Sequence, residues 1–178
     1  NCYAGGYALE VKNGRITWSK NMKTNKITRP GSKKSTVKTK KLKGSYYKII
    51  SKSKRTVQYV KPVKKNIISV IIPSSIKFNG KRYKVTGIAA NAFKNYKKLK
   101  KVTIGTNINK IGKKAFYGCS SLKNIKVKTS KLTNSRIGRQ AFKGIHKKSV
   151  IKVPKRQLKT YKKILKTKGI GKKVKIKK

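Results

Sequence analysis

The feature that most constrains the fold of this chain is a segment that occurs three times with the same apolar spacing. The repeats begin at Ile88, Ile111 and Ile137, so their starts are 23 and 26 residues apart. Counting from each isoleucine, alanine stands at position +4, phenylalanine at +5, and branched apolar residues at +14 and +16. Repeats of this length are typical of stacked units, each of which buries its apolar edge against its neighbours. The recurring residues are Ala92, Ala115 and Ala141, then Phe93, Phe116 and Phe142, and then the pairs Val102 and Ile104, Ile125 and Val127, and Ile151 and Val153.

The end of each repeat predicts a short strand. Because the apolar residues at +14 and +16 alternate with polar ones, they have the period of a strand with one covered face. The Ala-Phe step predicts a turn or short helical piece in which phenylalanine fills the space between units. A partial unit comes first, since Val70, Ile72 and Ile76 have the apolar spacing of the first full repeat. Asn79-Gly80 then separates two alternating runs and predicts a β-hairpin.

The second repeat, IGKKAFYGCSSLKNIKV, resembles the BspA-type leucine-rich repeat of bacterial surface proteins, particularly lysine-rich versions from anaerobic Gram-positive bacteria. The resemblance covers residues 67–178, and its most specific part runs from Gly118 to Leu122. The third repeat departs from the pattern, with Ile145 at the cysteine position and Lys148 at the leucine position. Terminal units of stacked repeats are commonly irregular, so this predicts an end cap. The resemblance implies adhesion or surface attachment and a secreted or cell-surface localisation.

The C-terminal region predicts a strand, a helix and a second strand. Pro154 suits the first turn of a helix, apolar residues recur at helical spacing over residues 158–165, and Gly169 provides a stop. Val174 and Ile176 alternate with lysines and predict a closing strand. We interpret this region as a lid over the last repeat. The alternative is a basic amphipathic helix that lies on a membrane surface.

The N-terminal region predicts further hairpins. Residues 45–50 and 56–60 read as two strands joined by a Ser-Lys-Ser-Lys-Arg turn, and we expect them to pack on the first repeat. Residues 20–41 have few apolar anchors and are predicted to be a flexible basic arm. Apolar residues around Asn13-Gly14 indicate another hairpin between residues 1 and 18.

We therefore expect a mainly β, α+β chain: a short leucine-rich-repeat solenoid with N-terminal β-hairpins and a C-terminal strand-helix-strand cap. A length of 178 residues suits one ordinary domain with an appendage, or two small domains. The expected organisation is a partly flexible basic segment over 1–41, a hairpin cap with the first partial repeat over 42–87, the leucine-rich repeats over 88–153, and the C-terminal cap over 154–178.

The charge of the chain is extreme. It has 53 lysine and arginine residues against one acidic side chain, Glu10, and a formal net charge of +52. Low hydrophobicity with such a charge favours an unfolded polycation, but the order of the residues contradicts this from about Leu42 onward. Only 7 of the 53 basic residues are arginine. Because lysine is a hydrated point charge, this composition favours diffuse attraction to polyanions over base-specific recognition.

Residues that could perform catalysis are scarce. The candidates with suitable intrinsic pKa values are Glu10, His146, Cys2 and Cys119. A Cys119–His146 dyad would lack an acidic orienting residue, so we predict that the protein is not an enzyme. The ligand sets of zinc and calcium sites and the nucleotide-binding fingerprints are missing from the sequence, so we predict no metal and no cofactor. Cys2 and Cys119 could form a disulfide, or Cys119 could be a small buried hydrophobe.

The candidate binding residues are lysines on the outward side of the predicted strands. Lys126 and Lys152 stand at +15, where Thr103 occupies the first repeat, while Lys101 stands at +13 and Lys128 at +17. Adjacent strands lie about 4.8 Å apart, so these lysines are predicted to form a ladder of like charges. Like charges that face each other cost stability, and bound anions would relieve that cost. The alternative is an ordinary solvated face without a dedicated partner.

Two functions are compatible with this ladder. The first is a secreted or cell-surface binding module, with no small-molecule substrate, that holds an anionic polymer: teichoic acid, glycosaminoglycan or mucin, with a host matrix protein as a further partner. The second is a non-specific nucleic-acid-binding protein in which tyrosines stack on bases. A membrane-active polycation is a third class, which the lack of a broad apolar face disfavours. The tyrosines considered for stacking are Tyr46, Tyr47, Tyr59, Tyr83 and Tyr96.

Overall fold

The computed structural model describes residues 11–12, 15–16 and 39–178. The chain divides into a unit from Asn1 to Val37 and a compact unit from Lys38 to Lys178. In the first unit, β1 (Val11–Lys12) pairs antiparallel with β2 (Arg15–Ile16), which confirms the predicted hairpin. The rest of that region, Cys2 included, lies outside the described residues, and so does the predicted arm from residue 20 to residue 38.

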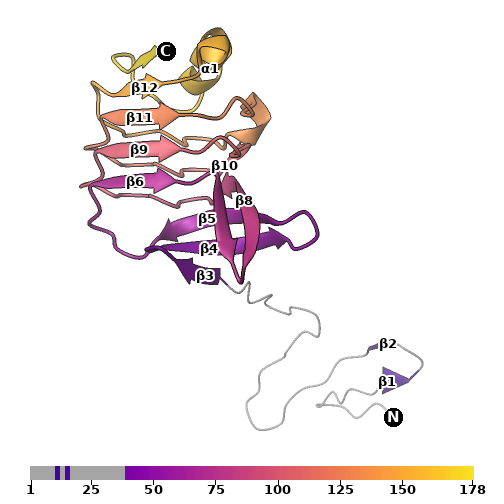
Figure 1. Ribbon diagram of the computed structural model, residues 1–178. Helices are drawn as coiled ribbons and strands as arrows, with labels where there is room; N and C mark the ends of the chain where they lie inside the picture. The colour runs from indigo at the N-terminus through magenta and orange to yellow at the C-terminus, as the bar shows by residue number, and fades with distance from the viewer. Residues whose placement is uncertain (1–10, 13–14, 17–38) are drawn as a thin grey trace, which may run out of the picture. The chain divides into compact units, whose positions relative to one another are not determined.

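A five-stranded parallel sheet forms one side of the compact unit (Figure 1). Each repeat contributes one strand where the positions +14 and +16 predicted it, so Val70, Val102 and Ile125 are in register across neighbouring strands. Ile72, Ile104 and Val127 follow two residues later and are buried. The strands, in chain order, are β6 (Ser69–Ile72), β9 (Lys101–Ile104), β11 (Asn124–Val127), β12 (Val150–Lys152) and β13 (Lys175–Lys177).

Aromatic rings fill the interior behind this sheet. Phe93 and Phe116 stack with ring centroids 5.0 Å apart, and Phe116 and Phe142 with centroids 5.3 Å apart. Tyr59 extends the column, at 5.4 Å from Phe93. All four side chains are fully buried. The phenylalanine at +5 therefore packs against its equivalents in neighbouring repeats, as the sequence predicted.

Close approach of the repeats explains two of the glycines. A Cβ atom on Gly112 would lie 2.3 Å from the backbone nitrogen of Ala90, and one on Gly138 would lie 2.3 Å from that of Lys113. Both glycines directly follow the opening isoleucine of a repeat. The isoleucines are themselves paired across repeats, Ile88 with Ile111 and Ile111 with Ile137. Glycine at residues 112 and 138 is therefore required by the close approach of the preceding repeat.

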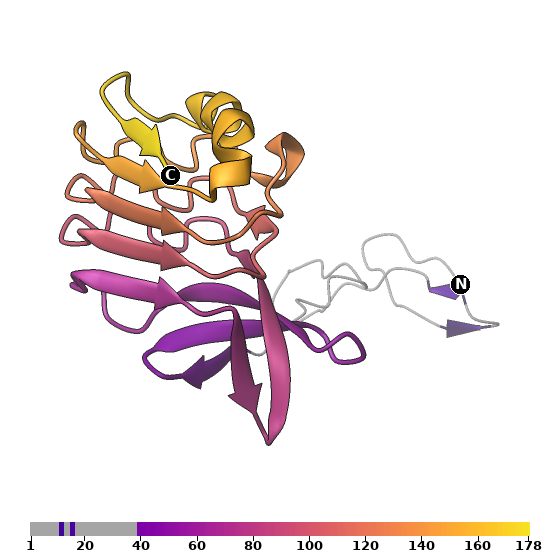
Figure 2. The ribbon, with the colours of Figure 1, turned by 45° about the horizontal axis from the view of Figure 1, so that its top comes forward.

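The N-terminal part of the compact unit is a second sheet, in the order β10-β8-β5-β4-β3, with β7 paired to β8. The hairpin of β4 and β5 is present as predicted. So is the β7–β8 hairpin, which extends away from the stacked strands (Figure 2) and turns at Asn79 and Gly80, both with positive φ. The elements are β3 (Thr39–Leu42), β4 (Ser45–Ser51), β5 (Thr56–Pro62), β7 (Ser75–Phe78), β8 (Lys81–Ile88) and β10 (Lys110–Ile111).

Strand β3 corrects one sequence-based expectation. Residues 39–41 were assigned to the flexible arm, but they pair antiparallel with β4 across a turn at Lys43-Gly44. The three residues are exposed and lack apolar alternation, so the sequence carried no strand signal. Backbone pairing to β4 organises them instead.

The single α-helix in the described part of the chain, α1 (Leu158–Lys166), lies where helical spacing predicted it, after a 3₁₀ turn at Lys155–Gln157. Its residues Tyr161, Ile164 and Leu165 are buried. The Tyr161 hydroxyl donates to the Thr129 carbonyl at 2.9 Å and accepts from the Leu132 N–H at 3.2 Å. The apolar side of α1 therefore packs on the protein itself, near the 3₁₀ turn Asn134–Arg136. The unit as a whole is mostly β with one short helix.

Candidate polyanion-binding face

The outward side of the five-stranded sheet carries lysines in register. Along the row at +15, Lys126 lies opposite Lys152, and Lys152 lies opposite Lys177. The row continues from Lys126 to Thr103 and then to Ile71. The three lysines are exposed while the residues beside them in the strands, such as Ile125 and Ile151, are buried. Strand alternation thus places three ammonium groups on one face.

Two shallow hollows lie along these lysines. The first, of about 370 Å³, is lined by Lys101, Asn124, Lys126 and Lys152, among others. The second, of about 400 Å³, is lined by Lys126, Lys128, Lys152 and Lys178. Because Lys126 and Lys152 line both hollows, they lie at the centre of the face. We refer to Lys101, Lys126, Lys128, Lys152 and Lys177 as the lysine face.

The structure brings the four predicted lysines to one face but does not place them in a single row. Lys101 lies opposite Ser69 and Asn124 rather than another lysine. Lys128 follows the end of β11, and its N–H donates to the Ile104 carbonyl at 2.9 Å. Only Lys126 and Lys152 among the four are directly opposed. The four lysines therefore do not form the expected ladder. Lys126 and Lys152 face each other on neighbouring strands, and Lys101 and Lys128 lie on the same face without an opposed lysine.

Sequence reasoning missed the contribution of β13. The closing strand was predicted from Val174 and Ile176, but the lysines between and after them were not assigned to the ladder. Parallel pairing of β13 with β12 adds Lys177 beside Lys152 and Lys175 beside Val150. The alternation of residues 174–177, Val-Lys-Ile-Lys, was the signal that could have assigned these lysines to the outward face.

Opposed charges on this face have no acidic counterpart. The described residues include no aspartate or glutamate. Lysines that lie opposite one another on neighbouring strands destabilise a sheet by roughly 0.2–1 kcal/mol for each pair. The arrangement is therefore favourable for anions, which would lower this repulsion when they bind.

The two groups of the conceivable catalytic dyad are engaged elsewhere. Cys119 is fully buried and its thiol donates to the Phe93 carbonyl at 3.0 Å. Burial raises the pKa of Cys119 to about 12, so the thiol stays protonated. His146 accepts from the Lys148 N–H through Nδ1 at 3.1 Å. Partial desolvation and the nearby Lys123, Lys147 and Lys148 lower the pKa of His146. Cys119 is a packing residue with a free thiol.

Most tyrosines considered for base stacking lie in the interior. Tyr47, Tyr59, Tyr83 and Tyr96 are buried, and Tyr46 is partly buried. Tyr59 shares a 3.0 Å hydrogen bond with the Ser45 hydroxyl, and its ring meets that of Tyr47 edge-on at 5.4 Å. The Tyr96 ring packs edge-on against Phe93 at 5.6 Å. The buried rings therefore present little free face for a base.

Among the described residues, no group of three or more histidine, cysteine or acidic side chains could hold a metal ion. In the same part of the chain, every buried side-chain nitrogen or oxygen atom has a hydrogen-bond partner. No helix described in the structure has the length and apolar character needed to cross a membrane.

Parallel strands in register, one from each repeat, with an aromatic column behind them, define a repeat protein. The chain belongs to the family of the BspA type leucine rich repeat region, whose sequence model matches residues 64–172 in 6 copies. No curated protein matches the chain. The comparisons indicate no enzyme family.

Two solved structures share the fold. One is a leucine rich cell surface protein from Faecalibacterium prausnitzii A2-165, with 24% identity and a TM-score of 0.50 over 66% of this chain and 37% of that one. The other is a leucine-rich repeat protein from Bacteroides capillosus ATCC 29799, with 20% identity and a TM-score of 0.52 over 78% of this chain and 97% of that one. At these identities the likeness concerns the fold alone.

Proposed function

We propose that the protein is a non-enzymatic, secreted or cell-surface binding module whose lysine face holds an anionic polymer. The observation that carries this proposal is the in-register row of Lys126, Lys152 and Lys177, in a region without acidic side chains. Membership of a repeat family supports a binding role, because leucine-rich repeat proteins are typically binding modules. The similar Faecalibacterium protein, described as a cell surface protein, supports the localisation.

In this proposal the parallel strands form a short solenoid that keeps the lysines in fixed rows. The last strands and α1 serve as its C-terminal cap, since the apolar side of α1 is buried against the repeats. A rigid row suits a polymer with regularly spaced negative charges better than a single small anion, because β11, β12 and β13 each offer one lysine, about 4.8 Å apart. Teichoic acid, glycosaminoglycan and sialylated mucin all provide such charges.

Non-specific nucleic-acid binding is the alternative function. The burial of Tyr47, Tyr59, Tyr83 and Tyr96 weighs against it, because single-stranded nucleic acid is bound through exposed aromatic rings in addition to charge. DNA would still bind at low salt, as it does to any polycation. The two functions are separated by competition at physiological salt, where heparin or teichoic acid should displace DNA.

The test compares the lysine face with an equal loss of charge elsewhere. The variant Lys126→Gln, Lys152→Gln and Lys177→Gln removes the in-register row. Its matched control, Lys94→Gln, Lys113→Gln and Lys147→Gln, removes three exposed charges from the turns of the repeats. Both proteins lose three positive charges, so their general attraction to polyanions falls equally.

We expect the row variant to elute from heparin at clearly lower salt than the control. Each lysine that contacts an anionic group contributes roughly 0.7–0.9 to the log–log salt dependence of binding. The slope for the row variant should therefore fall by about 2 or more, while the control changes little. Equal elution of the two variants would show that the charge acts without a dedicated face. DNA that resists heparin and teichoic acid would favour the alternative function.

A further inference from the structure

A hollow of about 890 Å³ lies beside β6, the edge strand of the five-stranded sheet. Residues of β6 and its flanks line one side, and the β3–β4 turn, residues 62–64 and β7 line the other. No residue of β9 takes part, so the hollow borders the side of β6 that β9 does not occupy. Its apolar lining includes Val63, Ile67, Val70, Ile71 and Ile76.

The edge of β6 is open for backbone pairing. Within the described residues, β6 pairs only with β9, so alternate backbone N–H and C=O groups on its other side have no strand partner. The edge is also apolar, since Ile71 is 72% exposed and the adjacent Ile68 is 60% exposed. An unpaired, apolar edge is a template for an additional strand.

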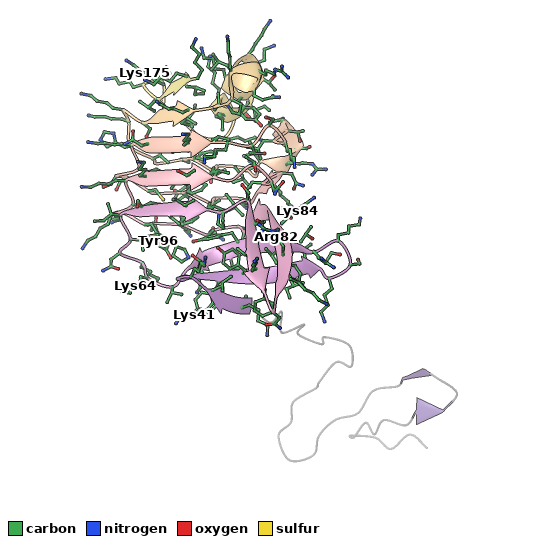
Figure 3. All side chains as sticks on the ribbon, viewed as in Figure 1. Lys41, Lys64, Arg82, Lys84, Tyr96 and Lys175 are labelled. Carbon is green, nitrogen blue, oxygen red and sulfur yellow. The ribbon has the colours of Figure 1, made fainter. Side chains whose placement is uncertain are left out.

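Basic side chains surround the hollow. Lys41, Lys64, Lys77 and Arg82 all line it, and Figure 3 shows Lys41, Lys64 and Arg82 at this end of the unit, opposite Lys175 near β13. Among the described residues, these four form one side-chain hydrogen bond, in which Arg82 Nη1 donates to the Ser75 hydroxyl at 3.1 Å. The hollow therefore combines an apolar lining, an open strand edge and a basic rim.

We propose that this hollow binds an extended acidic peptide of a partner protein, which adds to β6 as a further strand. A strand presents alternate side chains to opposite sides, so a segment that alternates apolar and acidic residues would place the apolar ones on the lining and the acidic ones by the rim. Charge excludes two other occupants. A second copy of this chain would bring a net charge of +52, and residues 17–38 of the chain itself contain lysines and arginine without an acidic residue.

None of the five lysines of the lysine face lines this hollow, so the proposal does not rest on the proposed function. The probe is a capped peptide of four Asp-Val repeats with a fluorescent label, measured by anisotropy against the full chain. Sodium chloride at about 0.5 M shortens the screening length to well under ~8 Å and suppresses diffuse attraction. A peptide of the same sequence with N-methyl groups on alternate residues removes backbone donors while keeping the charge.

The critical variant is Ile71→Lys, which adds a positive charge but removes the exposed apolar anchor and places a lysine at the edge. We expect its affinity for the Asp-Val peptide to fall about tenfold or more, as for a central interface anchor. The N-methylated peptide should bind equally weakly to the unmodified protein. The lysine-face variant Lys126→Gln, Lys152→Gln and Lys177→Gln should bind the Asp-Val peptide within about twofold of the unmodified protein, since its substitutions lie outside the hollow.

Each outcome of this experiment either supports or contradicts strand addition at β6. Circular dichroism first establishes that Ile71→Lys is folded, which the exposure of Ile71 favours; Ile71→Thr, without added charge, serves as a second variant and should also weaken binding. Undiminished affinity in both variants, or equal binding of the N-methylated peptide, would overturn strand addition at β6. Loss of binding in the lysine-face variant alone would place the peptide on the lysine face and also overturn the proposal.

Discussion

The two edges of the five-stranded parallel sheet differ in how they are protected. At one edge, β13 carries Lys175 and Lys177, both exposed, and α1 contacts it. At the other, β6 carries the exposed Ile71 next to the 890 Å³ hollow. Lysines on an edge strand discourage pairing with another chain, whereas an exposed apolar edge favours it. Addition of a further strand is therefore disfavoured at the β13 edge and favoured at the β6 edge.

The apolar β6 edge has no lysine on its strand. A net charge of +52 repels a second copy, so we expect the charge of the whole chain to limit self-association at this edge. The same charge attracts acidic partners. An open edge in a strongly cationic protein is therefore selective for partners of opposite charge.

The variant with the largest expected loss of stability tests whether β6 and β13 unfold together as one unit. Phe116 lies in the middle of the aromatic column, 5.0 Å from Phe93 and 5.3 Å from Phe142. Phe116→Ala should lower the free energy of unfolding by about 3–5 kcal/mol, because it leaves a large cavity at a fully buried site. Urea unfolding measures the loss, and amide hydrogen exchange at β6 and β13 locates it.

If the repeats are tightly coupled, exchange at β6 and β13 rises together in this variant. Stacked repeats can also unfold in parts, because each repeat contacts only its neighbours. Faster exchange at only one edge would show that the edges belong to separately stable parts, and the comparison between them would then concern two modules. A loss of less than about 1 kcal/mol would contradict the packing role assigned to Phe116.

A smaller effect distinguishes the two edges directly. Leu165 of α1 is 2% exposed, whereas Ile71 of β6 is 72% exposed. Leu165→Ala should cost about 2–4 kcal/mol, because it removes buried apolar contacts beside the C-terminal strands. Ile71→Ala should change stability by less than about 0.5 kcal/mol. Thermal and urea unfolding of both variants measure the contrast.

The two variants control for each other, since each shortens one aliphatic side chain to alanine, one in β6 and one in α1, which contacts β13 at the opposite edge of the sheet. Similar losses in both would mean that Ile71 is covered in solution, by self-association or by another part of the chain. A concentration dependence of the unfolding midpoint would then identify self-association.

Much of the fold followed from the repeat spacing. Positions +14 and +16 predicted β9, β11 and β12, and position +5 predicted the column of Phe93 and its equivalents, because these side chains face the interior in every repeat. Helix α1 followed from the spacing of its buried residues in the same way. Strand β3 could not be predicted, because its exposed residues Thr39 to Lys41 carry no apolar pattern and depend on β4 for pairing.

The candidate sites were predicted less completely. Lys126 and Lys152 followed from the shared repeat position, but Lys177 belongs to a strand outside the aligned repeats and was assigned only by the register of β13 with β12. The hollow beside β6 could not be predicted at all. Its lining comes from segments as far apart as Lys41 and Arg82, and only the tertiary arrangement brings them together.

The smallest expected change in stability concerns the row of Lys126, Lys152 and Lys177, which ends at β13. Lys152 lies between Lys126 and Lys177, so Lys152→Gln removes two unfavourable neighbours at once. At roughly 0.2–1 kcal/mol for each of the two pairs, the free energy of unfolding should rise by roughly 0.4–2 kcal/mol at low salt. The gain should vanish near 1 M salt, where the screening length is about 3 Å. Lys113→Gln, an exposed residue of a turn, is the matched control and should show little gain.

The sign of this effect also tests how the β13 edge is protected. If Lys152→Gln is destabilising at low salt, the aliphatic parts of the three lysines must pack on one another and outweigh the repulsion of their ammonium groups. Heparin provides the complementary measurement. Because a bound polyanion relieves repulsion only where lysines are opposed, heparin should raise the unfolding midpoint of the unmodified protein more than that of Lys152→Gln. An equal rise of the unfolding midpoint in both proteins would mean that the opposition of the lysines does not contribute to stabilisation by heparin.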